Sequence, residues 1–480
     1  MMTLRLPAFL QSPPQRFLWI MLASALVYGA MLCFYGADAH HQTRLARELF
    51  IWPVIIALLG LYVAGYQALK ASGRFQTHFL VISVALVALA ATAIQPFHST
   101  DLYGYVNRGW QQVAYHANPY VWTVDQIAGW TRDPMFTNHW VNNPCPYGFL
   151  FALTAKALCY AGAGHLNITT TLFKSANLLA HLAIGLLIWL SARRLGDAAP
   201  ERASYLYLAN PLILLHHLAN GHNDILMAFF LTLAAFTLVR GWRLLTLPCL
   251  VAATLIKYSA ILAIPFALMV IIRHGGWREA LKGVLLGFLL ALAIASPYVI
   301  DLPRFPWGEM GVNASISHNS LHSVIFTLYK VLAGWIPAWQ DAREMVKASL
   351  KAVLVLAFAG FYGWRLSLAW KDLRGAETLQ AARRFAMESL LTMLVAVGLA
   401  SAKFYAWYLG MFLPLAFFLS PRDELRRLTL TLAGAQLFGL TFLGQAHVLN
   451  FLLLSAAPVF PFVWRRLRPA TSPALETQAS

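Results

Sequence analysis

Long apolar segments constrain this chain more than any other feature. Runs of mostly apolar residues recur along nearly its whole length, and a helix needs about 20 such residues to cross a bilayer. Only 11% of the residues are charged and 59% are hydrophobic, which excludes a water-soluble globule. The sequence therefore predicts an all-α polytopic membrane protein. The clear runs are 17–36, 50–69, 78–96, 167–190, 203–217, 224–240, 280–300, 348–367, 386–401, 405–420, 428–443 and 446–464.

Lysine and arginine gather in short clusters between these runs, as they do in the cytoplasmic loops of membrane proteins. The formal charge of +17 therefore reflects topology, and nucleic acid is not predicted as a partner. Placing the clusters inside predicts cytoplasmic N and C termini and about 12–14 transmembrane helices. Three runs are ambiguous. Runs 147–162 and 321–336 are predicted not to span, and 244–272 is predicted to enter and return, turning near Lys257.

The organisation predicted from these runs is a single membrane domain over residues 1–467, followed by a disordered tail at 468–480. Two large extracytoplasmic loops, 97–146 and 301–347, carry much of the polar sequence. The cytoplasmic loops contain no GxxxxGK[ST] phosphate-binding motif. Chemistry is therefore predicted outside the cytosol, where ATP and nucleotide sugars are absent and an activated donor must arrive through the lipid. The sequence leaves open whether Cys145 and Cys159 form a disulfide.

The most informative polar segment follows the third apolar run and begins at Asp101. Tyr105 and Arg108 come four and seven residues later, on one face if this segment is helical. One interpretation is that Asp101 acts as a general base at the outer mouth of a cavity. The alternative is that its carboxylate caps an interfacial helix.

Several short motifs recur in order along the chain: Asp101-Leu-Tyr-Gly-Tyr105, Asn118-Pro-Tyr120, Pro144-Cys-Pro-Tyr147-Gly148, Asn210-Pro-Leu, Asn220-Gly-His222-Asn223-Asp224, Leu255-Ile-Lys257-Tyr258, and Trp407-Tyr408 with Pro414. Together these motifs resemble those of one enzyme group, the GT-C superfamily of glycosyltransferases. The chain looks most like the polyprenol-phosphate-mannose-dependent mannosyltransferases of bacterial envelopes, over roughly residues 78–420. It departs from them at Phe149 and Ala406, where similar sequences have proline.

The resemblance implies a GT-C fold and an inverting transfer of a hexose, mannose, from a polyprenyl-phosphate carrier to a glycan or glycolipid acceptor. It places the enzyme in the bacterial inner membrane with its active site facing the periplasm and Asp101 as the general base. The residues agree with this chemistry, because a phosphate leaving group needs no protonation and one carboxylate suffices, whereas glycoside hydrolysis uses two. No cofactor is implied. A divalent metal held by Asp101, His222 and Asp224 is the alternative.

The remaining candidate site residues are predicted to bind substrate. Lys257 lies in an apolar run, where a charge costs about 2.5–3.5 kcal/mol on insertion scales. It is predicted to bind the lipid phosphate, with pairing to Asp224 as the alternative, and Arg108 is the second phosphate candidate. The aromatic candidates have an alternative explanation, because Trp and Tyr are enriched in belts at both membrane surfaces. The other candidates are Tyr105, Tyr147, His222, Asn223, Asp224, Tyr258, Trp407 and Tyr408.

A transporter or flippase of a lipid-linked amphipathic substrate is the alternative function. It would also explain an intramembrane lysine and the polar turn at 220–224. Secondary transporters, however, have paired repeats and a site near the bilayer midplane. Here the polar residues cluster at the predicted outer boundary, which favours transfer chemistry.

Overall fold

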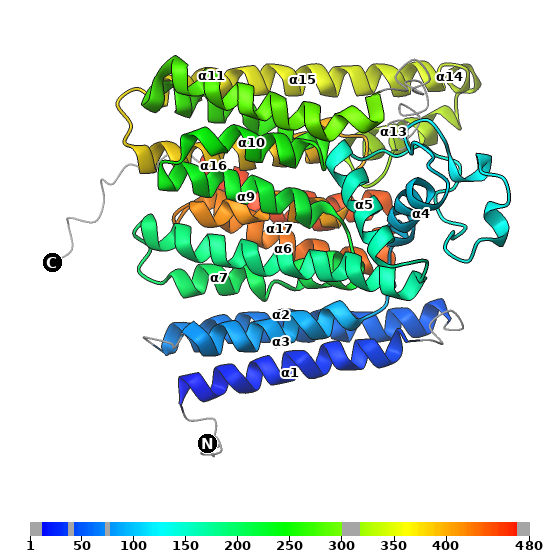
Figure 1. The fold of residues 1–480 in the computed structure, drawn as a ribbon, viewed down its shortest axis with the longest axis horizontal. Helices are drawn as coiled ribbons and strands as arrows, with labels where there is room; N and C mark the ends of the chain where they lie inside the picture. Colours follow the sequence, from blue (N-terminus) through cyan, green and yellow to red (C-terminus); the bar gives the residue numbers. More distant parts are fainter. Residues whose placement is uncertain (1–11, 37–42, 73–76, 300–316, 468–480) are drawn as a thin grey trace.

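The computed structural model describes residues 12–36, 43–72, 77–299 and 317–467. This part of the chain is helical and contains no β-strand, apart from one isolated parallel bridge between His318 and Lys403. The helices lie side by side in one bundle (Figure 1). The predicted all-α class is therefore confirmed. The predicted tail at 468–480 lies outside the described residues.

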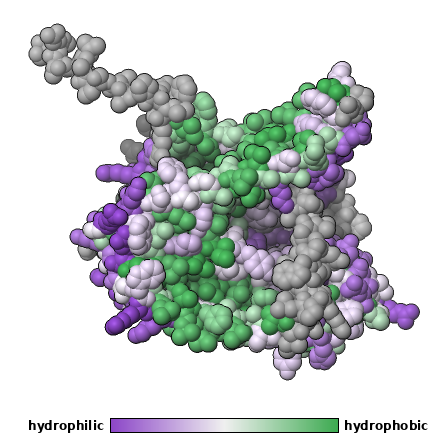
Figure 2. All heavy atoms as spheres, turned by 90° about the horizontal axis from the view of Figure 1, so that it is seen from above, coloured by the Kyte–Doolittle hydropathy of each residue, from purple (hydrophilic) through white to green (hydrophobic). Residues whose placement is uncertain are grey.

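Five helices in the described residues are long and apolar enough to cross a membrane. Large hydrophobic side chains are exposed along them, and Figure 2 shows an apolar band between polar ends. Such a surface suits contact with lipid, so the chain is a polytopic membrane protein. The predicted count of spans and the orientation of the termini stay predictions. The five segments are α1 (Pro13–Phe34), α2 (Arg44–Ala71), α6 (Leu166–Arg194), Tyr258–Val299, and α15 (Arg343–Asp372).

Other segments are shorter or interrupted, and these interruptions matter for the site. α7 (Pro200–Leu208) gives way to the short α8 (Pro211–Ile213) and a π-helical turn, η5 (Leu214–Ala219), before α9 (Asp224–Arg240). α16 (Thr378–Val395) continues into a second π-helical turn, η8 (Ala396–Ala400), and then two 3-10 segments, η9 (Ala406–Met411) and η10 (Leu413–Phe418). Broken helices are tolerated inside membranes where they are covered by protein or line a cavity.

The ambiguous run 244–272 is broken at the predicted place. α10 (Arg243–Thr254) ends before Lys257, and the 3-10 segment η6 (Tyr258–Ala263) starts directly after it. The chain then continues as α11 (Ile264–Val299), which packs along α10. Gly276, with φ of 76°, kinks α11. The 42 residues of Tyr258–Val299 therefore do not form one straight helix.

Four of the shorter helices gather at one end of the bundle (Figure 1). They are α4 (Asp101–Ala114), α5 (Phe149–Ala161), α13 (Leu321–Ala333) and α14 (Pro337–Gln340). The helix before α4 in the chain is α3 (Thr77–Ala93). α5 and α13 have 13 residues each, about 20 Å at 1.5 Å per residue. This is shorter than the roughly 30 Å hydrocarbon core, as expected for runs 147–162 and 321–336. Cys145 and Cys159 are both buried free thiols.

Candidate active site

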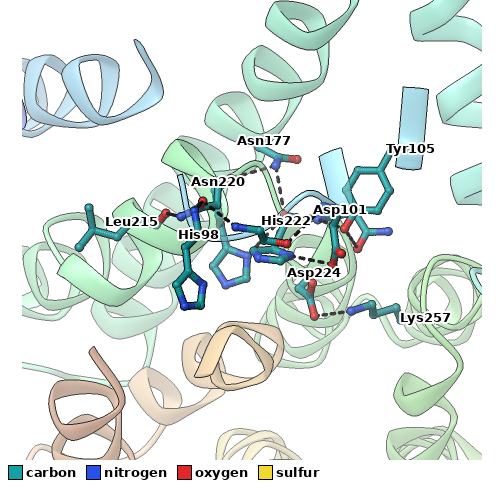
Figure 3. Close-up of polar contacts among 12 residues, drawn as sticks. His98, Asp101, Tyr105, Asn177, Leu215, Asn220, His222, Asp224 and Lys257 are labelled. Carbon is teal, nitrogen blue, oxygen red and sulfur yellow. Dashed lines mark hydrogen bonds and ion pairs between the residues drawn. The ribbon is translucent and has the colours of Figure 1, made fainter. Parts of the chain in front are cut away.

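Asp101 is the first residue of α4, and a side chain from a distant segment holds the chain just before it. The amide oxygen of Asn220 accepts hydrogen bonds from the backbone N–H groups of residues 97, 98 and 99, at 3.0, 2.8 and 3.3 Å. The amide nitrogen of Asn220 donates to the Leu215 carbonyl at 2.8 Å (Figure 3). Asn220 is fully buried, so this anchor is rigid. Asn220 belongs to the motif 220–224, and the sequence alone predicts no role for it.

The carboxylate of Asp101 is not a helix cap. The N-cap of α4 is Thr100, and no side-chain capping bond is present there. The backbone N–H of Asp101 donates to the Ser99 hydroxyl at 3.2 Å, while its side chain remains 19% exposed. The capping alternative is therefore wrong, and the carboxylate is available for another partner.

His222 lies directly behind Asp101, with its Nδ1 3.3 Å from the Asp101 Oδ2. Its ring is fully buried and stacks on Trp407, with centroids 4.1 Å apart and planes inclined by 14°. Asn177 donates to the His222 carbonyl at 3.1 Å. His222 is not among the residues that line the cavity described below. The geometry therefore favours a role in positioning Asp101 over direct contact with substrate.

The electrostatics around Asp101 keep it ionised. Burial by itself raises the pKa of this carboxyl, but the neighbouring His222 and the charge of Lys257 outweigh burial and lower the pKa below its usual value. At neutral pH the side chain is therefore a carboxylate, which is the state that a general base requires.

A second buried pair lies beside the first (Figure 3). The Lys257 ammonium is 2.5 Å from the Oδ1 of Asp224, whose side chain is fully buried at the start of α9. This is the pairing that sequence analysis kept as the alternative for Lys257. The same ammonium lies 5.1 Å from the Tyr408 ring centroid and 5.9 Å from that of Tyr147. The charge of Lys257 is therefore already compensated within the protein.

Tyr105 and Asn223 link α4 to the start of α9. The Tyr105 hydroxyl donates to the Asn223 amide oxygen at 3.2 Å and accepts from the Asn223 backbone N–H at 3.4 Å. Both residues are almost fully buried. Tyr258 donates to the Tyr147 carbonyl at 3.2 Å. The aromatic candidates thus hold segments together as well as lining the site.

Gly148 lets two backbone segments meet at the site. Its N–H donates to the Ile256 carbonyl at 3.1 Å, and that of Leu150 donates to the Leu255 carbonyl at 2.8 Å. A Cβ at Gly148 would lie 2.2 Å from the Leu255 oxygen. This close approach places the chain just before Lys257.

We expect Gly148→Ala to lower both stability and transfer activity, because the added methyl pushes the backbone at Leu255 and displaces Lys257. Overpacking of this kind typically costs about 1–3 kcal/mol. The thermal midpoint in detergent and the initial rate of sugar transfer measure the effect. Gly360→Ala is the matched control, since nothing lies within 4 Å of a Cβ built there. Equal behaviour of the two variants would contradict the close-approach explanation.

Arg108, the second phosphate candidate, is committed to the loop that follows α4. Its Nη2 donates to the carbonyls of Trp140, at 2.6 Å, and of Asn143. Its Nη1 donates to the Gln111 side chain at 3.3 Å. The side chain is only 2% exposed. The contacts therefore favour a role for Arg108 in holding this loop in place.

These residues surround one cavity of about 750 Å³, within the range of ligand sites. Asp101 and Lys257 both line it, although 156 residues separate them in the chain. In the described part of the protein, Asp101 is the only carboxylate in the lining, against four cations. Of the candidates, His222, Asn223 and Asp224 are not among the residues that line the cavity. The candidates that line the cavity are Asp101, Tyr105, Arg108, Tyr147, Lys257, Tyr258, Trp407 and Tyr408, and the other two cations are Lys351 and Lys403.

Lys403 also lines the cavity, and the sequence alone predicts no role for it. The neighbouring backbone pairs with His318, which donates from its N–H to the Ala402 carbonyl at 2.9 Å and accepts from the Phe404 N–H at 2.8 Å. The Lys403 side chain makes no ion pair or hydrogen bond with any described residue. Burial lowers the pKa of its ammonium. A half-buried cation without a protein partner is suited to an anionic ligand.

The alternative of a metal site receives no geometric support from the described residues. Three fully buried histidines lie close together beside Trp407, yet no three His, Cys, Asp or Glu side chains in the part described here are arranged to hold an ion. The prediction that no cofactor is needed stays a prediction. The three histidines are His216, His217 and His222.

Comparison with known proteins identifies the family of this chain. The family model for the MptA_B family, described as alpha-(1->6)-mannopyranosyltransferase, N-terminal domain, matches residues 19–273. This is more than half of the chain, and it includes Asp101, Asn220, His222 and Lys257. The chain belongs to this family. It is therefore a membrane glycosyltransferase, and the resemblance to the GT-C mannosyltransferases is confirmed.

Two curated relatives of the transferase come from mycobacteria. It is 25% identical to alpha-(1->6)-mannopyranosyltransferase A of Mycobacterium tuberculosis over 402 residues, which cover 73% of this chain and 72% of the relative. It is 29% identical to a probable alpha-(1->6)-mannopyranosyltransferase of Mycolicibacterium smegmatis over 185 residues, 35% of this chain and 29% of that protein. No solved structure matches the chain. Lys403, Trp407 and Tyr408 lie beyond the segment matched by the family model.

Proposed function

We propose that this transferase moves a mannosyl group from a polyprenyl-phosphate carrier to a glycan or glycolipid acceptor, with inversion and formation of an α-(1→6) linkage. The observation that carries the proposal is the cavity in which one carboxylate, Asp101, stands among four cations. The family and the relatives support mannose and the linkage through their names. We place the cavity on the extracytoplasmic face of a bacterial inner membrane.

The reaction follows from the chemistry of a phosphate leaving group. The acceptor hydroxyl attacks the anomeric carbon, the bond from that carbon to the phosphate oxygen breaks, and the phosphate takes the electron pair. Asp101 accepts the hydroxyl proton as the new bond forms. Because phosphate leaves as a stable anion, no second acid is required, in contrast to glycoside hydrolysis. Inversion with an α product requires a donor whose phosphate is β-linked.

His222 completes this assignment as a positioning residue. The buried imidazole lies 3.3 Å from the Asp101 carboxylate and stacks on Trp407, while Asn177 donates to the backbone carbonyl of His222. Burial and stacking on Trp407 restrict rotation of the ring, which therefore stays close to one carboxylate oxygen of Asp101. The other oxygen is left to receive the acceptor proton.

The donor lipid suits the remaining lining of the cavity. Beyond the charged residues, the lining includes small and apolar side chains on η8 and η9. Such a surface accommodates the first isoprene units of a carrier, while Lys403, which has no partner among the described residues, supplies positive charge for its phosphate. These apolar residues are Ala396, Val397, Ala400 and Met411.

We assign the phosphate contact to Lys403 and expect Lys403→Met to raise the KM for the donor by about 10- to 100-fold. Hydrogen bonds to charged groups are worth about 1.5–3 kcal/mol, and each 1.4 kcal/mol is about tenfold in affinity. Initial rates at varied donor concentration measure the effect. Lys403→Arg should recover much of the loss.

Lys156→Met is the matched control for Lys403→Met, because Lys156 is an exposed lysine on α5 that does not line the cavity. It should leave the donor KM unchanged. An unchanged donor KM in Lys403→Met would remove Lys403 from the phosphate site.

The proposed function is tested with purified protein in detergent. Synthetic short-chain polyprenyl phosphate-mannose is supplied with a panel of glycan acceptors, and glucose and arabinose donors serve as comparisons. We expect product from the mannose donor alone, with an α-(1→6) linkage by NMR. Transfer from a nucleotide sugar, with none from any polyprenyl-phosphate sugar, would overturn the proposal.

A further inference from the structure

Trp140 combines a strained backbone with an exposed indole at the cavity. Its φ is 59°, in the left-handed region that bulky residues rarely adopt. Its side chain is 47% exposed and lines the same cavity as Asp101. Residues held in such conformations cluster at ligand-binding sites, where the surrounding structure keeps them in place. The strain at Trp140 therefore calls for a functional explanation.

Two buried side chains of α4 hold Trp140 in this conformation. The Arg108 guanidinium donates to the Trp140 carbonyl at 2.6 Å. The Asn107 amide donates to the carbonyls of Thr137 and His139, both at 2.9 Å, and its oxygen accepts from the Thr137 N–H at 3.0 Å. Asn107 is fully buried and Arg108 nearly so. The backbone on both sides of the indole is thereby fixed to the helix that begins at Asp101.

A glycine in the same helix sets the position of the indole. A Cβ at Gly104 would lie 2.9 Å from the Cδ1 of Trp140, so the ring packs directly against α4. Gly104 comes three residues after Asp101, less than one helical turn along the axis. The aromatic ring therefore packs on the helix that begins at Asp101 and lines the same cavity as its carboxylate.

We infer that Trp140 is the acceptor-binding platform, and that its indole packs against the uncharged sugar whose hydroxyl is presented to Asp101. The inference rests on the proposed function and adds to it the residue that selects the acceptor. A neutral aromatic face suits a sugar ring, whereas the donor phosphate requires the cations described above. Because the ring is already held in place, little conformational freedom is lost when the acceptor binds.

The test compares Trp140→Asn with Trp140→Phe. Asparagine tolerates left-handed backbone, so Trp140→Asn removes the ring and spares the conformation, whereas Trp140→Phe keeps an aromatic face. We expect Trp140→Asn to raise the acceptor KM by about tenfold or more and Trp140→Phe to stay within about threefold of wild type. The donor KM should stay unchanged in both. Trp122→Asn, an exposed tryptophan of the same loop outside the cavity lining, is the matched control.

Direct binding separates this inference from the proposed function. The probe is a synthetic octyl glycoside of an α-(1→6)-linked dimannoside, titrated into the donor-free protein and each variant. A weaker Kd in Trp140→Asn, with recovery in Trp140→Phe, supports the platform. Unchanged acceptor KM and Kd in Trp140→Asn, an increase in donor KM instead, or no recovery with phenylalanine would overturn it. Absence of transfer by the wild-type protein would contradict the proposed function, and the binding comparison would still decide the role of Trp140.

Discussion

Asp101→Asn is expected to lower kcat for sugar transfer by about 10²- to 10⁴-fold, the usual contribution of a general base. The change replaces a carboxylate by an amide of nearly the same shape, so the position set by Asn220 and the fold of α4 are retained. The amide cannot accept the proton of the acceptor hydroxyl as the new bond forms. Single-turnover rates with saturating donor and acceptor measure the chemical step directly.

The matched control is Asp341→Asn, which removes an exposed carboxylate in the segment that follows α14. It should leave kcat unchanged. Donor and acceptor binding by Asp101→Asn should stay close to wild type, because the general base contributes mainly in the transition state. Near-normal turnover of Asp101→Asn would remove this residue from its assigned role.

The largest loss of stability is expected from Lys257→Met. This change leaves the fully buried Asp224 carboxylate without its counter-charge, whereas the ammonium is 2.5 Å away in the native protein. Removing one partner of a buried ion pair typically costs about 3–5 kcal/mol. The midpoint of thermal unfolding in detergent should fall clearly below that of wild type.

The double variant Lys257→Met with Asp224→Asn is the decisive comparison. Removing both charges eliminates the uncompensated carboxylate, so most of the stability should return. Lys347→Met provides a surface control, since the 3.9 Å pair of Lys347 with the exposed Glu344 is worth at most about 1 kcal/mol. A double variant no more stable than Lys257→Met alone would contradict the pairing argument.

The same double variant also separates the two roles considered for Lys257. We expect its donor KM to lie within about threefold of wild type, below the effect of a lost charged hydrogen bond, because Lys403 is a cavity cation that has no partner among the described residues. A much larger increase at restored stability would instead assign the Lys257 ammonium to the phosphate, as the sequence predicts.

Much of the architecture could be predicted because its signals are local. An apolar run long enough to cross a bilayer must satisfy its backbone hydrogen bonds internally, so it becomes a helix wherever it lies in the chain. The break near Lys257 could also be predicted. Basic residues flank both ends of the run 244–272 and favour the same side of the membrane, so the chain must turn back within a run too short for two full crossings. Asp101 was singled out because it comes directly after an apolar run, within a motif shared with known transferases.

What the sequence determined was therefore the class of fold, the break in the run 244–272 and the residue types that chemistry would need. The tertiary structure alone decided which of them meet: Asn220 with the chain before Asp101, His222 behind the carboxylate, Asp224 with Lys257, and Lys403 facing the cavity without a described partner. The physical reason is that a buried polar group requires a partner but does not specify which one. The packing of helices from distant parts of the chain makes that choice.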